Sequence, residues 1–220
     1  MRALADLAAV FKLRIGVAIA LSAVAGLAAT PGPRPEGWQI ALIAGSVLLS
    51  AASSGAFNHY VEADLDARMA RTRSRPFVAG RFARGPIWLS IIVGLLALAV
   101  GAAWVGTNAV AAFHVLMGAF VYGVVYTVWL KRRTAWNIVW GGLSGSFAVL
   151  AGAAVVDPTP APVPLLLALV LFLWTPPHFW ALATALRDDY VAGGVPMLPV
   201  VVGSKKAAEI ILAKIGRAHV

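Results

Sequence analysis

Cysteine is absent from this 220-residue sequence, and charged residues are scarce. Without cysteine the chain can form no disulfide, bind no zinc through thiolates and use no thiol as a nucleophile. Only 12% of the residues are charged, about half of what a soluble domain carries, whereas 60% are hydrophobic. So few charges cannot cover a soluble surface, so we expect lipid to surround much of the protein.

Long apolar stretches account for most of the sequence. Each has about 20 residues, the length that an α-helix needs to cross the hydrocarbon of a bilayer. They cover residues 15–30, 38–58, 86–105, 109–130, 136–156 and 163–184, and a seventh begins near Ala207. The sequence therefore predicts an all-α integral membrane protein with about six complete spans and the start of a seventh, folded as a single domain over residues 1–214.

The first apolar stretch has a second interpretation as a cleaved signal peptide. Lys12 and Arg14 precede the apolar residues, and the small residues Ala28-Ala29-Thr30 follow them. Both interpretations place Pro31 outside the cell, so topology does not separate them. We favour a retained helix.

Basic residues lie almost entirely on one side of the predicted spans. They occur before the first span, in the 2–3 and 4–5 loops and after the sixth span, whereas Arg34 is alone in the opposite loops. An excess of Lys and Arg marks the cytoplasmic side, so we expect an inner (cytoplasmic) membrane protein with these loops and the N-terminus in the cytoplasm. The net charge of +9 has the same origin. No nucleic-acid-binding motif accompanies it, so we expect no nucleic-acid partner.

The last six residues, Ile-Gly-Arg-Ala-His-Val, carry an unusual coincidence. Back-translated as ATC GGA AGA GCA CAC GTC, they match a common sequencing adaptor. We therefore expect residues 215–220 to be non-native and the natural protein to continue past them; a chance match is the alternative.

An acidic cluster lies at the end of the second predicted span. Asn58, Glu62 and Asp66 are spaced four residues apart, which places them within ~80° of one another on a helix, whereas Asp64 points elsewhere. Carboxylates stacked on one face repel each other unless a cation lies between them, and Mg²⁺ prefers such oxygen ligands. A solvated helix end is the alternative for an acidic trio on its own.

Two neighbouring features favour a metal–diphosphate site over a solvated helix end. Arg68, Arg71, Arg73 and Arg75 follow the acidic cluster, and guanidinium groups bind phosphate oxygens in pairs. Pro76 prevents a continuous helix, so this segment can fold over the site. A second acidic pair, Asp188-Asp189, follows the sixth span on the same side, and two such sites could hold two metal ions on one diphosphate.

The acidic cluster and its arginines resemble a known motif. The pattern Asn58-x₃-Glu62-x-Asp64-x-Asp66-x₂-Met69-x-Arg71-Thr72-x₂-Arg75-Pro76 resembles the first Asp-rich motif of the UbiA superfamily of intramembrane prenyltransferases. Residues 126–139, Trp174-x-Pro176-Pro177-His178-Phe179-Trp180, and Asp188-Asp189-Tyr190 with residues 194–200 resemble the branch of that superfamily that farnesylates heme. The matches run from about residue 12 to 206. Two departures are Glu62, where many members have Asp, and a second motif without Asp-x₃-Asp.

The resemblance implies a fold, a reaction and a set of site residues. The fold is a UbiA-like bundle of nine helices around a central cavity. The reaction transfers a farnesyl group from farnesyl diphosphate to a vinyl group of heme B, giving heme O, with Mg²⁺ as cofactor. Product handover to a heme A synthase or a terminal oxidase assembly is a further expectation. The implied residues are Asn58, Glu62 and Asp66 for catalysis; these three with Asp64, Asp188 and Asp189 for metal; Arg71, Arg75, Lys131 and Arg132 for diphosphate; and His178, His59 and Tyr190 for heme or another acceptor.

Two other functions stay open. One is a UbiA-type enzyme with an aromatic acceptor such as 4-hydroxybenzoate, naphthoate or chlorophyllide, which the residues from His178 onward disfavour. The other is a membrane transporter, which predicts acids near the middle of the bilayer rather than at the ends of spans. The role of His178 is equally open between a heme contact and a histidine bonded to carbonyls freed by Pro176 and Pro177. For His114 we expect a hydrogen bond between helices.

Overall fold

The computed structural model describes residues 2–159 and 161–216, and within them every regular element is a helix. The predicted tail 215–220 falls only partly in this range, and residues 217–220 lie outside it. The helices are α1 Arg2–Val10, α2 Leu13–Ala28, α3 Gly37–Val61, α4 Ala63–Asp66, α5 Pro86–Gly106, α6 Ala109–Phe120 with its continuation η1 Val121–Leu130, α7 Asn137–Val156, α8 Pro162–Ala185, α9 Arg187–Gly193, α10 Leu198–Val202 and α11 Ser204–Gly216.

The expected all-α membrane architecture is confirmed, but the expected number of spans is not fixed. By length and composition, five helices could each cross a membrane: α3, α5, α6 with η1, α7 and α8. A sixth span results if α1 and α2, which meet at a bend of 48°, are taken together. The predicted seventh span corresponds to α11, which is 13 residues long. The protein is therefore a multi-pass membrane protein with five or six candidate spans in the described part of the chain.

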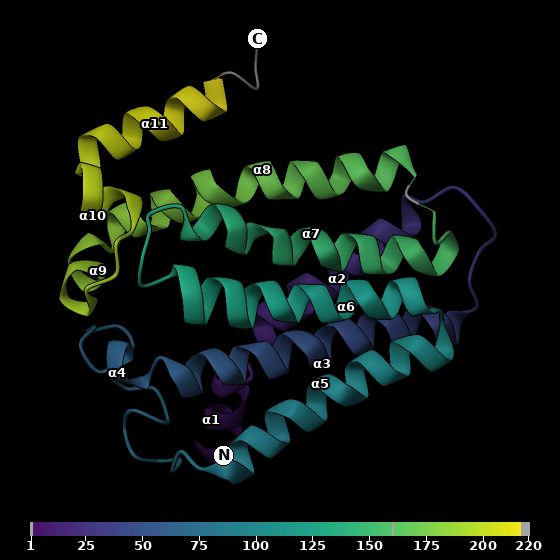
Figure 1. Cartoon of the computed structure of the whole chain (residues 1–220), viewed down its shortest axis with the longest axis horizontal. Coiled ribbons are helices and arrows are strands. Elements are labelled where there is room, and N and C mark those ends of the chain that lie inside the picture. The colour runs from purple at the N-terminus through teal and green to yellow at the C-terminus, as the bar shows by residue number, and fades with distance from the viewer. Residues whose placement is uncertain (1, 160, 217–220) are drawn as a thin grey trace.

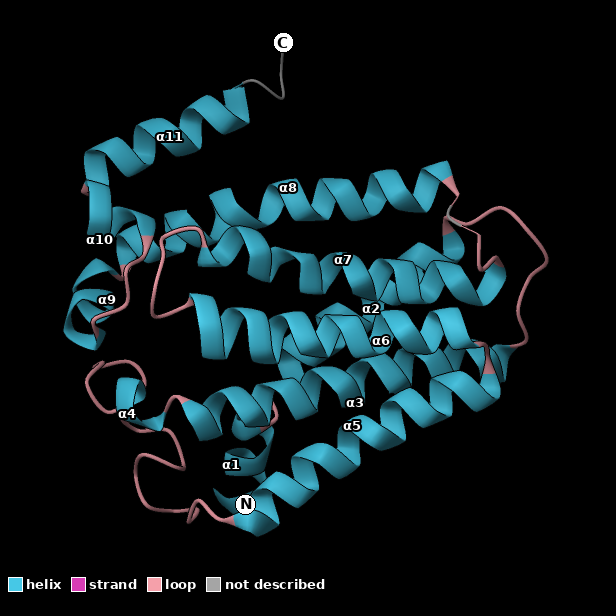
Figure 2. Ribbon diagram, viewed as in Figure 1, coloured by secondary structure: helices cyan, strands magenta, loops and turns pink. Residues whose placement is uncertain are grey.

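The long helices lie side by side in one bundle (Figure 1). Helix α7 packs against α2, α6 and α8, and α3 packs against α2 and α5. The short helices α4, α9 and α10 gather at one end of the bundle, and the connectors that contain residues 31–36 and 157–159 lie at the other (Figure 2). The basic loops of the sequence therefore meet at the end that carries α4 and α9.

Helix α2 is an integral part of the bundle. Its residues Ala20, Ala23 and Leu27 are buried in the main apolar core together with residues of α3, α5, α6 and α7. This packing supports the retained helix over the cleaved signal peptide.

The backbones of α2 and α7 touch. A Cβ atom built on Gly152 would lie 1.7 Å from the carbonyl oxygen of Ala23, and one on Gly26 would lie 2.0 Å from that of Val149. Only glycine fits at such an approach, as is usual where membrane helices pack through small residues. This contact holds the C-terminal halves of α2 and α7 together.

Candidate active site

The site is built where α3 ends. Helix α3 stops at Val61, Glu62 forms a joint with φ −92° and ψ 10°, and α4 continues to Asp66. Two helical hydrogen bonds persist across the joint, from Glu62 N to Asn58 O (3.0 Å) and from Asp66 N to Glu62 O (2.8 Å). The four-residue spacing therefore still brings Asn58, Glu62 and Asp66 to the inner side, where they are 2%, 0% and 1% exposed. We call these three residues together the carboxylate group, after Glu62 and Asp66; its third member, Asn58, is an amide.

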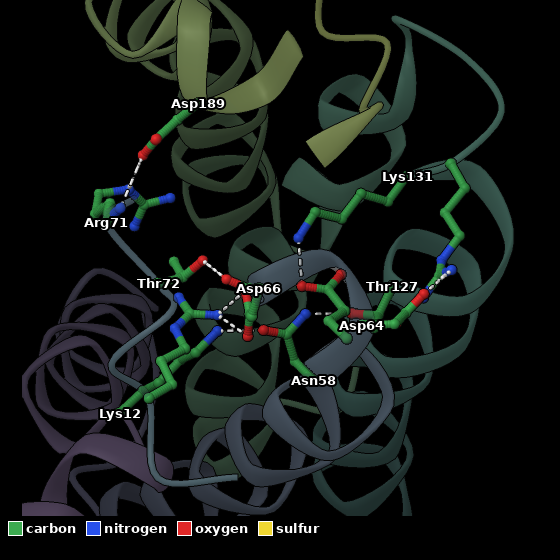
Figure 3. A network of polar contacts seen from close by, with 12 residues as sticks. Lys12, Asn58, Asp64, Asp66, Arg71, Thr72, Thr127, Lys131 and Asp189 are labelled. Atoms are coloured by element: carbon green, nitrogen blue, oxygen red, sulfur yellow. Dashed lines mark hydrogen bonds and ion pairs between the residues drawn. The ribbon is translucent and has the colours of Figure 1, made fainter. Parts of the chain in front are cut away.

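Each member of the carboxylate group is bound by a basic side chain from a different part of the chain. Lys131, which follows η1, donates to Glu62. Arg75 Nη1 donates to both carboxylate oxygens of Asp66, at 2.8 and 2.7 Å. Lys12 Nζ donates to Asn58 Oδ1 at 2.6 Å. Figure 3 shows Lys12 and Lys131 approaching the carboxylate group from opposite sides. The fold thus surrounds a buried acidic centre with three basic groups.

Lys12 is a site residue that sequence reasoning missed, because it was counted only as a flanking charge. It lies at the break between α1 and α2 with a φ of 48°, the one positive φ of a non-glycine residue within 2–159 and 161–216. Its ammonium also donates to the hydroxyl of Tyr122 at 2.8 Å. A positive φ is costly for a residue with a side chain and is often retained at functional sites. The signal in the sequence was a lysine directly before an apolar span.

The segment from Val121 to Leu130 is a π-helix rather than the ordinary helix that its apolar pattern predicts. Its wider turn is visible in the backbone hydrogen bond from Lys131 N to Tyr126 O, five residues back, at 2.9 Å. The Thr127 hydroxyl donates to Tyr122 O at 2.8 Å. Thr127 in turn accepts from Asn58 Nδ2 at 3.1 Å. Helices of this kind are rare in proteins, and those that occur are often at functional sites. This one brings Tyr122, Thr127 and Lys131 to the carboxylate group together.

The two residues of the predicted second acidic pair, Asp188 and Asp189, lie in different surroundings. Asp189 accepts hydrogen bonds from the backbone N–H groups of Ala70 (2.9 Å) and Arg71 (3.2 Å), and Arg71 Nε lies 4.0 Å away (Figure 3). Helix α9 therefore holds the segment that follows α4. Asp188 faces water, and its carboxylate lies 3.7 Å from Arg187.

Asp64 and Arg132 form an ion pair outside the buried site. Two guanidinium nitrogens of Arg132 donate to the two oxygens of Asp64, each at 2.8 Å. The hydrogen bonds from Arg132 hold the pKa of Asp64 below its usual value. Asp64 points away from the carboxylate group, as its position in the sequence predicts, although it was also a predicted metal ligand.

The three predicted acceptor residues lie in different surroundings. Tyr190 is buried beside the charges of Arg71 and Glu62, and burial raises its pKa. His59 is buried, and its Nδ1 has no hydrogen-bond partner. His178 lies exposed on α8 and stacks on Trp174, with ring centroids 4.3 Å apart. No hydrogen bond in the described part of the chain joins His178 to the carbonyls near Pro176 and Pro177.

The carboxylate group has the donor chemistry for a divalent ion. Oxygen Oε1 of Glu62 is buried and has no hydrogen-bond partner, so it is free to bind a cation. Within residues 2–159 and 161–216 no three His, Asp or Glu side chains converge on one point. Protein ligands for an ion would thus be two carboxylates and the Asn58 amide. Mg²⁺ fits such a set, because it usually takes a few protein oxygens and completes its shell with water and phosphate.

An apolar cavity opens beside the carboxylate group and runs into the bundle. Its empty volume is about 700 Å³, which includes the space that is open to the outside. Lys12 and Tyr122 line its polar end, and Ile15 and Phe179, which are also exposed, line its opening. His114 lines it too. The prediction that His114 makes a hydrogen bond between helices is wrong. Its Nδ1 has no hydrogen-bond partner, and its ring contacts Phe113 and Phe147 instead.

The site combines three properties. A buried acidic centre can hold a divalent ion, basic groups around it can bind an anion, and an apolar cavity next to both can hold a hydrocarbon. This combination suits a substrate with a diphosphate head and a lipid tail.

Comparisons with known proteins agree with this chemistry. The chain is 64% identical over 207 residues to protoheme IX farnesyltransferase 2 of Paramagnetospirillum magneticum, covering 94% of this chain and 72% of the relative. It is 47% identical to protoheme IX farnesyltransferase 1 of the same organism, covering 92% and 71%. A solved UbiA homolog from Archaeoglobus fulgidus, bound to GPP and Mg²⁺, has the same fold, with a TM-score of 0.81 and 17% identity over 95% of this chain and 73% of that one. The UbiA prenyltransferase family matches residues 19–216, and the chain belongs to this family.

Proposed function

We propose that this protein transfers a farnesyl group from farnesyl diphosphate to a vinyl group of heme B, giving heme O. The observation that carries the proposal is the buried carboxylate group, with its three basic partners, at the end of an apolar cavity. The choice of substrates is supported by the relatives, two of which are named protoheme IX farnesyltransferase at 64% and 47% identity.

The diphosphate binds among the basic groups of the site. Lys12, Arg75 and Lys131 are now engaged with the carboxylate group, and each exchanges that partner for a phosphate oxygen when the substrate enters. Arg71 is half exposed beside Asp189 and closes over the outer phosphate. Mg²⁺, held by Asn58, Glu62 and Asp66, would supply the charge that joins these acids to the diphosphate and stabilises it as a leaving group.

The remaining predicted ligands have weaker support. Asp189 stays a candidate for a second ion, because it lies next to Arg71 at the edge of the site. Asp64 and Asp188 face water, and Arg132 is engaged with Asp64, so each would have to move to take part.

Departure of the diphosphate is the first chemical step. The bond between C1 of the farnesyl group and oxygen breaks, and both electrons leave with the diphosphate, so that an allylic cation remains. The rings of Tyr122 and Tyr126 lie 5.5 Å apart at the site and face the ammonium groups of Lys12 and Lys131 at 5.4 and 5.6 Å. Aromatic faces that attract ammonium groups also stabilise a carbocation. The apolar cavity keeps water away from the cation until the acceptor reacts.

The acceptor approaches through the opening at Ile15 and Phe179. The vinyl group of heme B supplies the electron pair for the new carbon–carbon bond, which leaves a cation on the vinyl carbon next to the porphyrin. Water binds to that carbon and loses a proton, which completes the hydroxyethylfarnesyl group. His178 lies next to Phe179 and is exposed, so it is placed to contact a planar acceptor that waits at the opening. His59 and Tyr190 are candidates for contacts at the polar end of the cavity.

The basic loops and the carboxylate group lie at the same end of the bundle. We place this end in the cytoplasm and the protein in the inner (cytoplasmic) membrane, because Lys and Arg concentrate there. Handover of heme O to a heme A synthase or a terminal oxidase assembly is part of the same proposal.

An acceptor panel tests the proposal. Membranes that contain the protein are incubated with farnesyl diphosphate, Mg²⁺ and one acceptor at a time: heme B, 4-hydroxybenzoate, a naphthoate or chlorophyllide. We expect a farnesylated product from heme B alone. Product from a phenolic acceptor and none from heme would replace the acceptor but keep the diphosphate site. Absence of any product together with absence of diphosphate binding would favour the transporter.

A further inference from the structure

The apolar cavity has a measurable depth. Gly55 on α3 and Tyr122 on η1 line its polar end, and Val47 on α3 and His114 on α6 line its far end. Eight positions separate the two residues on each helix. At a rise of 1.5 Å per residue, both helices give a depth of about 12 Å. The agreement of two separate helices indicates a cavity that runs parallel to the bundle.

The far end of the cavity is a closed floor. Ile19 of α2 and Ala148 of α7 line it, and about one helical turn further on the backbones of α2 and α7 touch at Ala23 and Gly152. Val47 and Ala148 are 4% and 5% exposed and belong to the main apolar core. A chain that enters from the polar end therefore cannot continue between α2 and α7.

His114 occupies part of this floor. Its ring contacts Phe113 of the same helix, with ring centroids 5.5 Å apart, and Phe147 of α7, with centroids 5.8 Å apart, and its Nδ1 is buried without a hydrogen-bond partner. A polar atom without a hydrogen-bond partner does not stabilise the wall of an apolar cavity, so the nitrogen of His114 gives no advantage over a hydrophobic side chain. The contribution of the ring is the space that it fills.

We infer that His114, with Ile19 and Val47, determines the length of the prenyl chain and limits it to three isoprene units. This inference rests on the proposed function and deepens it. Each isoprene unit adds four bonded carbons in line, or about 5 Å for carbon–carbon bonds of about 1.5 Å. Three units, about 15 Å when extended, exceed the depth of about 12 Å by about 3 Å and must bend to fit, whereas a fourth unit, about 20 Å in all, needs the space of the imidazole.

The test measures binding of prenyl diphosphates without any acceptor, so that it does not depend on heme. Dissociation constants are measured with Mg²⁺ for the diphosphates of C10, C15 and C20 chains, and for inorganic pyrophosphate. In the unchanged protein the C15 diphosphate should bind tightest. His114→Ala removes five ring atoms, about one isoprene unit, and should improve C20 relative to C15 binding by at least about 10-fold, since such pockets discriminate roughly 10–200-fold.

A matched control and an opposite variant complete the test. Phe120 lies on the same helix but is exposed, does not line the cavity and makes no ring contact with His114, so Phe120→Ala should leave the preference unchanged. Ala51 lines the cavity between its two ends, so Ala51→Leu should shift the preference from C15 towards C10. If His114→Ala also loses pyrophosphate and thus its fold, Ala51→Leu carries the test by itself.

Four outcomes each overturn a claim, and they can be told apart. An unchanged C20-to-C15 ratio in a folded His114→Ala protein, or the same shift in Phe120→Ala, overturns the role of His114. An Ala51→Leu protein that still prefers C15 overturns the closed cavity. Failure of the unchanged protein to bind any prenyl diphosphate or pyrophosphate overturns the proposed function instead.

Discussion

Replacing Lys131 by Met should destabilise the protein far more than an ordinary loss of a charge. Lys131 is the partner of Glu62, which is fully buried and whose Oε1 already has no hydrogen-bond partner. Lys131→Met leaves both oxygens of a buried carboxylate unpaired. Breaking a buried pair in this way costs roughly 3–5 kcal/mol. For a chain of this size the melting temperature should fall by about 6–20 °C, at roughly 2–4 °C per kcal/mol.

Two control variants separate the buried charge from the loss of a lysine. Arg132→Met breaks the Arg132–Asp64 pair, whose side chains are 39% and 47% exposed, and should cost no more than about 1 kcal/mol. The double variant Lys131→Met with Glu62→Gln removes the unpaired charge and should recover most of the lost stability, although it restores no activity. Thermal unfolding in detergent, followed by circular dichroism, measures all three. Equal melting temperatures for Lys131→Met and Arg132→Met would refute the reasoning.

Two further predictions concern the carboxylate group and the bundle. Asp66→Ala should abolish prenyl transfer and weaken diphosphate binding in the presence of Mg²⁺, whereas Asp64→Ala should retain most of both, because Asp64 faces water; a fully active Asp66→Ala protein would remove Asp66 from the site. Gly152→Ala should destabilise by at least roughly 1–3 kcal/mol, since its Cβ would lie 1.7 Å from a carbonyl oxygen of α2. Gly101→Ala, where no atom lies within 4 Å of the new Cβ, should leave the melting temperature unchanged or slightly raised, and equal effects of the two changes would contradict the close contact.

Hydropathy was enough to predict most of the fold. The predicted stretch 109–130 coincides with α6 and η1 together, and the stretch 163–184 lies within one residue of α8 at each end. These helices are set by long apolar sequences between polar or proline-containing loops, which are local signals. The π-helical form of η1 has no such signal, because it depends on contacts of Thr127 and Lys131 with α3 and Glu62.

The acidic part of the site followed from spacing, but its basic part did not. The four-residue spacing identified Asn58, Glu62 and Asp66 and turned Asp64 outward, both of which depend only on helix geometry. The pairing of Lys12 with Asn58 joins residues 46 positions apart, and that of Asp189 with the backbone of Ala70 joins residues 119 apart. Such contacts arise from the packing of distant helices, which the sequence pattern does not contain.

The most direct test of the proposed reaction is the mass spectrum of the hemes extracted from cells. The complete gene product is expressed in cells that make heme B and farnesyl diphosphate but have no other activity that farnesylates heme, beside an Asp66→Ala variant expressed at the same level. Cells with the unchanged protein should accumulate a heme heavier than heme B by one farnesyl group and one hydroxyl group, and cells with Asp66→Ala should contain heme B alone. Unmodified heme in both, with the unchanged protein present in the membrane and able to bind farnesyl diphosphate, would contradict heme as the acceptor.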